Sequence, residues 1–496
     1  MFERYFAAHP LGEVRYAPQF PVSTDRTAWE SVVPADRAVL LAYAEKCREK
    51  PWSVITAGMY ASFVRTGSRR DCENPYFERR RRLCSAVLRV CLTGTEEFLP
   101  DVEDGVVLIC EETAWAISAH LGLNADHPFP DERANTVDLF AAQTAMILSF
   151  TAQLLEGVLH PDLHERIRRE VERRVLRPFM EYNGEWWMGY TRKDLNNWTP
   201  WILSNILMAA NVWHWGGAEL IVRACMMLDR WLDCVPEDGG CDEGAGYWNM
   251  AGGAFLDCLM VLESMCGVDL WQDEKVCRMM AYPELVHLGK GWYANFADCD
   301  ARPSVSGDRL MYAGEKTGNP ALVRMGLELR ESPEAPLLDT PHLSRVLMRL
   351  FSRHAEAEAA VIKPKDVWLP DLQVRLVEQD GMIAAMKGGH NDENHNHNDV
   401  GSFLIMANGD MQVVDAGNMI YTAKTFSDRR YELWNCRAAY HNVPIIGGCE
   451  QQAGRQYAAR DVEKPPAAWR WIWLRPIRRK RACSNAAAPS VWLAAD

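Results

Sequence analysis

The spacing of hydrophobic residues changes once along this chain, near residue 360, and this change limits the fold more than any other feature. Up to about Arg353, apolar residues recur every three or four positions, as on one face of a helix. Beyond it they alternate with polar residues, as in a strand with one buried face. Because helices and strands fall in separate runs, we expect an α+β protein with an N-terminal helical domain and a C-terminal antiparallel β domain.

The helical part contains several segments with a clear pattern, at 36–49, 77–92, 137–155, 164–176, 200–210, 218–232 and 251–265. The whole region predicts roughly ten to thirteen helices, with Pro, Gly or Asp at the breaks. No repeated signature marks a consensus solenoid. We therefore expect antiparallel helix pairs wound into a ring, an (α/α) toroid, or another large helical array.

The C-terminal part contains four short alternating segments that predict strands, at 374–377, 382–386, 402–407 and 410–415. Asn408-Gly409, between the last two, is a dipeptide that favours a type I′ hairpin turn. A two-residue turn there pairs Ala407 with Asp410 and places Asp415 opposite Ser402. We therefore divide the chain into a helical domain at 1–355, a β domain at 356–463 and an irregular basic tail at 464–496.

Composition limits the partners of the chain. Its 496 residues carry a formal net charge of −13, which disfavours nucleic acid and acidic membranes. The N-terminal stretch holds Glu3 and Glu13 without a signal-peptide apolar run, and no stretch is apolar enough for a transmembrane helix. The scattered cysteines are typical of reduced thiols. We expect a cytoplasmic protein with no nucleic-acid or membrane partner, and a homodimer is one assembly that the sequence allows.

The basic block 478–481 in the tail is the one segment suited to a polyanion or a membrane. The tail around it has neither strand alternation nor a helical face. A disordered or non-native tail is the interpretation that its composition favours.

The segment 389–448 concentrates the residues that can carry chemistry. It contains four of the 13 histidines, and the residues of interest are His390, His395, His397 and His441 together with Asp392, Asp399 and Asp415. Two imidazoles and one carboxylate are a common ligand set for Zn²⁺. Exposed polar loop residues are the alternative. If His397 shares a metal with Asp415, residues 395–400 must fold back as a loop, which their Asn-rich composition favours.

Three ordered motifs carry a family resemblance: HNHNDVGSF at 395–403, VVDAG at 413–417 and the segment 425–448. Together they resemble the C-terminal signature of the heparinase II/III-like polysaccharide lyases. The resemblance is firm over residues 389–448 and weaker over the helical part. It implies an (α/α) toroid followed by an antiparallel β-sandwich, and elimination at uronic acids.

The resemblance also implies site residues in the signature. One Zn²⁺ would be held by His397, Asp415 and His441, and His395 would be catalytic. The metal is expected to be structural, because β-elimination consumes no water. An incomplete sandwich is also implied, since members of the family continue for more strands after the last motif.

In the helical part, the resemblance implies a catalytic Asn and a catalytic Tyr. The matching positions are Asn197 in DLNNWTPW and Tyr247 in DEGAGYWNM, with Asn196 as the alternative Asn. Many members carry His after this Asn, whereas this chain has Trp198, which places more of the chemistry on Tyr247 and His395. Without the resemblance, Asn197 is an ordinary helix N-cap and Tyr247 a packing residue.

Four further residues are candidates for substrate binding. Aromatic rings stack on sugar faces, and arginine pairs with carboxylates and sulfates. Trp198 and Trp248 each adjoin a candidate catalytic residue, while Tyr431 and Arg437 lie in the signature. Core packing and ordinary ion pairs are the alternatives.

The substrate chemistry connects these residues. Removing the C5 proton of a uronate builds a second negative charge, so an Asn amide that neutralises the carboxylate, with Tyr and His as base and acid, suits elimination. We expect a lyase acting on acidic oligosaccharides or polysaccharides of glycosaminoglycan or alginate type. Two alternatives stay open: a glycoside hydrolase on an (α/α) toroid that uses Asp242 and Glu243, and a truncated, non-catalytic carbohydrate-binding homologue.

Overall fold

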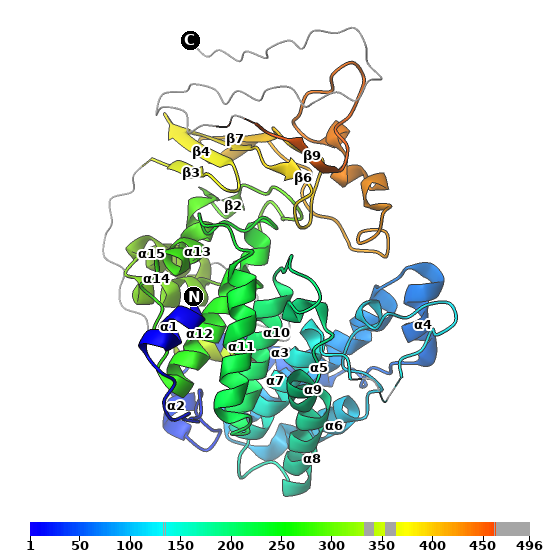
Figure 1. The fold of residues 1–496 in the computed structure, drawn as a ribbon. Helices are drawn as coiled ribbons and strands as arrows, with labels where there is room; N and C mark the ends of the chain where they lie inside the picture. Colours follow the sequence, from blue (N-terminus) through cyan, green and yellow to red (C-terminus); the bar gives the residue numbers. More distant parts are fainter. Residues whose placement is uncertain (132, 134, 332–341, 353–363, 461, 463–496) are drawn as a thin grey trace. The chain divides into compact units, whose positions relative to one another are not determined.

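The computed structural model describes the whole chain except residues 132, 134, 332–341, 353–363, 461 and 463–496 (Figure 1). About half of the chain is helical, and small antiparallel sheets follow the helices, in the predicted order. The chain packs as two compact units. The first contains Met1–Cys234, Ala254–Leu270 and Ser332–Ala355, and the second contains Val235–Gly253, Trp271–Glu331 and Glu356–Asp496.

This division differs from a single boundary at 355/356, a position that lies outside the described residues. The segments 235–253 and 271–331 group with the sheets although they precede them in the chain. They do so because their loops pack side chains against the strand region, as the site below shows. The predicted basic tail, 464–496, also lies outside the described residues.

The first unit is built from helices, namely α1 (Phe2–Ala8), α2 (Arg26–Glu30), α3 (Pro34–Arg48), α4 (Ala57–Thr66), α5 (Arg70–Thr93), α6 (Leu99–Cys110), α7 (Leu139–Leu154), α8 (Pro161–Val171), α9 (Arg177–Glu181), α10 (Trp198–Val212), α11 (Gly217–Leu232) and α16 (Leu343–Phe351). Helices α7 and α10 pack on each other, as do α3 with α5 and α5 with α6. Nearly every residue of α7 and α10 is buried, because both helices are apolar around their whole circumference.

Each helix predicted from the hydrophobic pattern is confirmed. The segment predicted at 164–176 is α8 continued by a π-helical turn at Glu172–Leu176. The described residues form sixteen α-helices, more than the pattern predicts. Short helices such as α2 and α9 have too few residues to show a period.

The second unit combines helices α13 (Glu274–Leu285), α14 (Gly307–Thr317) and α15 (Pro320–Glu331) with three sheets, while α12 (Gly252–Cys266) spans both units. The largest sheet has the order β3-β4-β5-β7-β8, from β3 (Asp366–Leu369), β4 (Val374–Gln379), β5 (Met382–Lys387), β7 (Phe403–Ala407) and β8 (Asp410–Val413). Two small pairs are β1 (His287–Gly289) with β2 (Trp292–Tyr293), and β6 (His390–Asn391) with β9 (Gly454–Ala458). All of these pairings are antiparallel.

The hairpin between β7 and β8 confirms the predicted turn. Asn408 and Gly409 both have positive φ, at 52° and 82°, as a type I′ turn requires. Ala407 pairs with Asp410 as expected. Between Met406 and Ile405 an irregularity shifts the register by one residue, so that Ile405 pairs with Val413. Beyond the end of β8, the Ser402 hydroxyl still donates to Asp415 Oδ2 at 3.2 Å. The contact that the register prediction implied is therefore present despite the shift.

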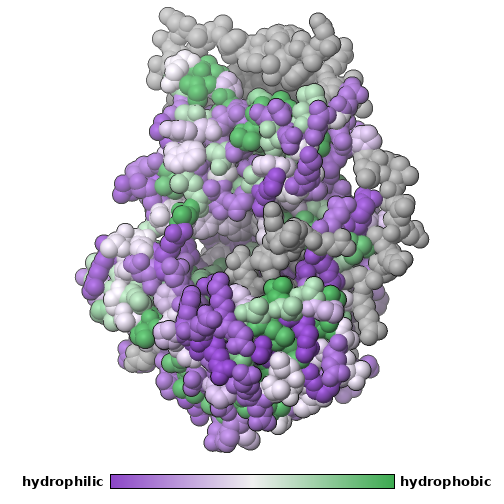
Figure 2. Space-filling view, turned by 180° about the vertical axis from the view of Figure 1, so that it is seen from behind, coloured by the Kyte–Doolittle hydropathy of each residue, from purple (hydrophilic) through white to green (hydrophobic). Residues whose placement is uncertain are grey.

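Two general properties of the chain complete the description. Among the described helices, none is both long and apolar enough to cross a bilayer. Seen from behind, the surface is mostly hydrophilic, with hydrophobic side chains scattered over it (Figure 2). The described cysteines, from Cys47 to Cys449, are all free thiols.

Candidate active site and metal centre

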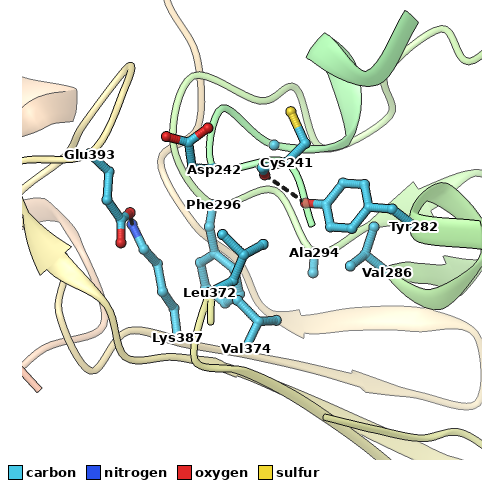
Figure 3. Close-up of a pocket in the computed structure, with 11 residues that line it drawn as sticks. Cys241, Asp242, Tyr282, Val286, Ala294, Phe296, Leu372, Val374, Lys387 and Glu393 are labelled. Atoms are coloured by element: carbon cyan, nitrogen blue, oxygen red, sulfur yellow. Dashed lines mark hydrogen bonds and ion pairs between the residues drawn. The ribbon is translucent and has the colours of Figure 1, made fainter. Parts of the chain in front are cut away.

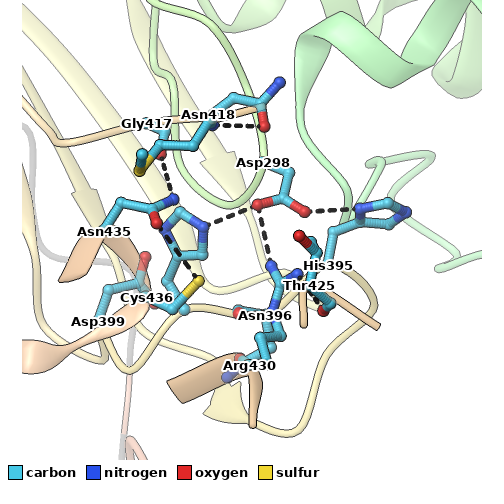
Figure 4. A network of polar contacts seen from close by, with 12 residues as sticks. Asp298, His395, Asn396, Asp399, Gly417, Asn418, Thr425, Arg430, Asn435 and Cys436 are labelled. Atoms are coloured by element: carbon cyan, nitrogen blue, oxygen red, sulfur yellow. Dashed lines mark hydrogen bonds and ion pairs between the residues drawn. The ribbon is translucent and has the colours of Figure 1, made fainter. Parts of the chain in front are cut away.

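Asp298, in the loop after β2, is the centre of the site in the second unit. Its Oδ2 is 2.7 Å from His395 Nδ1 and accepts a hydrogen bond from the Tyr421 hydroxyl at 3.2 Å. Its Oδ1 is 2.9 Å from His397 Nε2 and accepts from the Arg430 guanidinium at 2.9 Å. Figure 4 shows the carboxylate between His395 and Arg430. Burial alone would raise the pKa of Asp298, but the two histidines and Arg430 hold it well below its ordinary value.

The loop that carries both histidines folds back after β6, as the Asn-rich composition predicted. His395 sits at φ 52°, in the left-handed region that residues with a β-carbon rarely adopt. Lys387, at the end of β5, fastens the loop with ion pairs of 2.9 Å to both Glu393 and Asp399. Strain of this kind persists only where surrounding contacts impose it, and here buried ion pairs do so.

A small cavity lies beside this loop, between Asp242, Lys387 and Glu393 (Figure 3). Its volume is about 20 Å³, enough for a water molecule and far too small for a sugar. The Asp242 carboxylate accepts a hydrogen bond of 2.8 Å from the Asn394 side chain. Asp242 therefore helps to hold the histidine loop.

His395, Tyr247 and Tyr421 form what we call the tyrosine–histidine cluster. Tyr247 lies in a short helical turn, Ala245–Asn249, and its hydroxyl forms a short hydrogen bond with the Tyr421 hydroxyl. The rings of Tyr247 and His395 are 4.4 Å apart, and the Tyr421 hydroxyl is 3.2 Å from His395 Nδ1. The other ring nitrogen, His395 Nε2, is 3.7 Å from the buried Glu243 carboxylate. Three groups that can exchange protons therefore converge on one point.

The environment decides how these groups are protonated at rest. Burial raises the pKa of both Tyr247 and Tyr421 well above the ordinary phenol value, so both are neutral. Arg430 acts in the opposite direction on Tyr247, lowering the pKa of its hydroxyl. Burial also lowers the pKa of His395, but the neighbouring Glu243 and Asp298 outweigh it and leave that pKa above its ordinary value.

His397, Asp415 and His441 form a second group, which we call the metal triad. All three side chains are buried, and one ligand atom from each lies within 4.8 Å of the others. His441 Nδ1 is 2.8 Å from Asp415 Oδ2, while His441 Nε2 is 2.8 Å from the Asn435 carbonyl. The three residues that the sequence selected from 389–448 are thus brought together.

The donor set of the metal triad fits a divalent metal such as Zn²⁺. His397 uses Nε2 to contact Asp298, and its Nδ1 is buried without a hydrogen-bond partner in the described part of the chain. A buried nitrogen left without a partner costs free energy unless something binds it. In metal sites, each histidine typically has one nitrogen on the metal and the other on a carboxylate or carbonyl. His397 Nε2 on Asp298 and His441 Nε2 on the Asn435 carbonyl match the second of these contacts, and the two Nδ1 atoms would then be the metal ligands.

Asn197 and Trp198 belong to the first unit, at the start of α10. Asn197 is buried at the N-cap position, but its side chain does not cap the helix. The neighbouring Asn196 instead accepts a hydrogen bond of 3.1 Å from the Trp198 backbone N–H. The alternative that Asn197 is an ordinary helix N-cap therefore does not explain why this position carries an Asn side chain.

His120 is a residue near Trp198 that sequence reasoning missed. The two rings are 4.6 Å apart, and His120 Nδ1 is 2.7 Å from the buried Asp138 carboxylate. Asp138 also caps the N-terminus of α7, accepting backbone N–H groups from Phe140 and Ala141. The only sequence signal for this pair is an Asp before an apolar helical run, which is too common to indicate a site.

The substrate-binding predictions have mixed outcomes. The prediction for Trp248 is wrong, because its ring is only 1% exposed and its indole N–H donates to the Met279 carbonyl at 2.9 Å. Arg437 is already paired with Glu450, so it is not a free cation. The Tyr431 hydroxyl accepts a hydrogen bond of 3.0 Å from Asn396, which lies between the two histidines of the motif.

The sequence does not single out Asp298 or Tyr421. It offers Glu243 only as a hydrolase carboxylate and Arg430 only as a cation for the substrate, not as neighbours of His395 and Asp298. Asp298 lies 97 positions before His395 and has no motif around it. Tyr421 follows Asp415 in a segment whose spacing gives neither a helix nor a strand. Only the fold brings these residues to the histidine loop.

Comparison with solved structures shows what the fold resembles. A crystal structure of heparinase III matches with a TM-score of 0.55 at 13% identity, over 94% of this chain and 69% of that chain. A second heparinase III gives a TM-score of 0.48 at 11% identity, over 86% and 70% of the two chains. A chondroitin AC lyase from Streptomyces coelicolor A3 gives 0.45 at 12% identity, over 77% and 57%.

At this level of identity, the first of these likenesses establishes a shared fold and nothing finer. This chain spans about two thirds of the heparinase III structures and 57% of the chondroitin AC lyase. No protein-family model and no curated protein sequence matches it.

Proposed function

We propose that this chain is a polysaccharide lyase of the heparinase II/III-like kind, which cleaves uronic-acid glycans by β-elimination. In this proposal the first unit is the (α/α) toroid and the sheets belong to the β-sandwich. The observation that carries it is the chain of contacts from the Tyr247 hydroxyl to the Tyr421 hydroxyl and from there to the buried Asp298, which His395 Nδ1 also contacts. The fold shared with heparinase III supports it.

Elimination needs one group that moves a proton from C5 to O4 of the sugar. The C5–H bond breaks, a C4=C5 double bond forms, and the C4–O4 bond breaks as O4 gains a proton. We propose that the Tyr247 oxygen accepts the C5 proton while its own proton passes to Tyr421 and the Tyr421 proton passes to the Asp298 carboxylate. The Tyr247 hydroxyl then gives a proton to O4, and the two relayed protons return from Asp298 to Tyr421 and from Tyr421 to Tyr247. No water is consumed and the tyrosines end as they began.

The surroundings of Tyr247 suit this role. Its buried hydroxyl starts neutral and can therefore act as the acid, while Arg430 and the Tyr421 hydrogen bond favour transient negative charge on its oxygen. His395, fixed by Asp298 and facing Glu243, lies beside both phenols and would complete the acid–base machinery.

The uronate carboxylate must be neutralised while C5 loses its proton. We propose that Asn197 performs this task, with Trp198 as a sugar-binding ring, because the Asn197 side chain does not cap α10. His120, oriented by Asp138 and lying against Trp198, offers a second donor there. It would replace the histidine that many relatives carry in the position of Trp198.

We also propose that the metal triad binds one Zn²⁺. His397 would contribute Nδ1, together with Asp415 and His441. When bound, the ion would supply positive charge that ties the histidine loop to the segments after β8. The residues of the chain that handle protons are separate from it, which agrees with a structural role.

The geometry favours elimination over hydrolysis. A glycosidase needs two carboxylates that both face the scissile bond. Here Asp242 is bound to Asn394, while Glu243 is buried against His395. No specific observation supports hydrolysis by this pair.

The test is product formation from hyaluronan, chondroitin sulfate, heparan sulfate and alginate oligomers. Elimination creates an unsaturated uronyl end that absorbs ultraviolet light, whereas hydrolysis does not. We expect this absorbance with at least one polymer, and its loss in Tyr247→Phe and His395→Ala. New reducing ends without the absorbance would establish a hydrolase instead, and full activity in both variants would overturn the site.

A further inference from the structure

A cavity of about 220 Å³ lies within the first unit, between α3, α5 and the segment that joins α3 to α4. It is about ten times larger than the cavity beside the histidine loop, whose volume is about 20 Å³. A single water needs only about 10–15 Å³ of such space, so the cavity leaves room for a small organic molecule of roughly a dozen heavy atoms. None of the residues discussed above as catalytic lines it.

The lining of this cavity is strongly basic. Five cationic side chains line the cavity, those of Lys46, Lys50, Arg79, Arg81 and Arg82. Glu78 supplies the one carboxylate of the lining. The whole chain, by contrast, has a net charge of −13. Anions are the ligands that a basic cavity attracts.

Part of this charge is already neutralised. Arg79 pairs with Glu112 at 3.2 Å, and Arg82 pairs with Asp101. Lys50 is 3.8 Å from Glu78. By contrast, no acidic side chain in the described part of the chain pairs with Lys46 or Arg81. These two cations therefore leave the cavity with a positive surplus.

Trp52 forms a rigid wall of the cavity. The Arg82 guanidinium lies 4.2 Å from the centre of its ring, and the far edge of the indole presses on α6. A β-carbon at Gly105 would lie 2.7 Å from that edge, so only glycine allows the ring to sit there. The indole is therefore held in one position before any ligand arrives.

Two buried donors of this wall lack a partner in the described residues, Trp52 Nε1 and Arg82 Nε. Arg82 is 9% exposed and uses its other nitrogens for Asp101 and the Lys50 carbonyl. A buried N–H without an acceptor costs free energy, because it has lost its hydrogen bonds to water. An oxygen-rich ligand would satisfy both donors.

We propose that this cavity binds a monosaccharide-sized sugar acid, a hydroxylated ring that bears a carboxylate. Lys46 and Arg81 would attract the carboxylate, and the Trp52 indole and Arg82 would donate to ring oxygens. An inorganic anion would satisfy the charge but leave most of the volume empty. The inference concerns the first unit alone and does not depend on the proposed elimination.

The test uses the full-length chain labelled with 5-fluorotryptophan and titrated with D-glucuronate, glucose or sodium sulfate at constant ionic strength. The fluorine signal of Trp52 is identified by its disappearance in Trp52→Phe. We expect glucuronate to shift this signal saturably, with glucose and sulfate at least tenfold weaker. The same shift in Tyr247→Phe would show that it is independent of the tyrosine–histidine cluster.

Matched variants locate the charge requirement. Lys46→Gln with Arg81→Gln should weaken glucuronate binding at least tenfold. Arg4→Gln with Arg65→Gln removes the same charge from two exposed positions outside the cavity and should leave binding within twofold. Trp52→Phe, followed by calorimetry, should weaken binding severalfold because one donor is lost.

Four results would overturn the proposal. A Trp52 signal that does not saturate with glucuronate would exclude the site. Equal affinity for glucose would exclude an anion site, and equal affinity for sulfate would indicate an adventitious ion only. Unchanged binding in the Lys46 and Arg81 double variant would show that the cavity charge is irrelevant.

Discussion

The tyrosine–histidine cluster and the metal triad each contain one histidine of the same motif, two residues apart, and both histidines contact Asp298, yet their surroundings differ. His395 is partly exposed, with its side chain 11% accessible, and both of its ring nitrogens face groups that can gain or lose protons. His397 is fully buried, and its Nδ1 faces only the other two members of the triad. The difference teaches that two histidines of one short motif can have unlike surroundings, which is why we propose proton transfer for His395 and metal binding for His397.

A substitution of Asp298 should damage the tyrosine–histidine cluster and the metal triad together, because its carboxylate contacts both His395 and His397. Asp298→Asn keeps the shape but removes the charge that offsets Arg430 and His395. We expect activity to fall at least about 1,000-fold, and stability to fall by about 3–5 kcal/mol because buried charges lose their partner. Product absorbance and urea unfolding measure the two effects. Loss of only one of them would show that Asp298 serves a single region.

Tyr247→Phe should separate the regions by damaging only the first. Loss of the proton-carrying hydroxyl should lower kcat by about 100- to 10,000-fold, with KM little changed. The metal content and the unfolding midpoint should stay near those of the unaltered chain. Tyr182→Phe, at a ring that is 56% exposed, is the matched control. A comparable fall in kcat for Tyr182→Phe would remove the special role of Tyr247.

His441→Ala should damage the second region first. The variant should lose bound zinc by elemental analysis, and its Tm should fall, because a ligand that binds only the folded state stabilises it. Chelation of the unaltered chain should lower Tm in the same direction, and added Zn²⁺ should restore it. A chain that is purified without metal and gains no stability from Zn²⁺ would contradict the triad assignment.

Tyr431→Phe should give the smallest effect and act on both regions. It removes one acceptor from Asn396, the residue between His395 and His397. The loss of one neutral hydrogen bond should cost about 0.5–1.5 kcal/mol of stability. Activity should fall less than tenfold. Urea unfolding of the two chains measures the stability difference, and initial rates measure the activity difference. A loss as large as that of Tyr247→Phe would instead place Tyr431 on the substrate.

The sequence predicts those features that depend on local pattern. The change of hydrophobic period gives the helices and the main strands, and Asn408-Gly409 gives the hairpin, because left-handed dihedrals favour those two residue types. The metal triad also follows from a compact signature, since His397, Asp415 and His441 lie within a short stretch of chain.

The remaining parts of the site depend on contacts between distant segments. Asp298 reaches His395 from a loop that belongs by pattern to the helical region, and no local signal marks that loop. For Trp248, by contrast, the sequence predicts a site residue that the structure does not support. Trp248 is next to Tyr247 in the chain, but its ring is buried and does not lie with Tyr247 at the site. Neighbouring residues in an irregular turn point in different directions, and periodicity does not determine them.

The distance of 97 positions between Asp298 and His395 has a consequence for the order in which the molecule assembles. During synthesis, Asp298 leaves the ribosome long before its partners, and its carboxylate lacks its full set of partners until residues up to 430 follow. Contacts between distant segments also form slowly. Helicity should therefore return early in refolding, and catalytic competence should lag behind it by the time needed to close this one long loop.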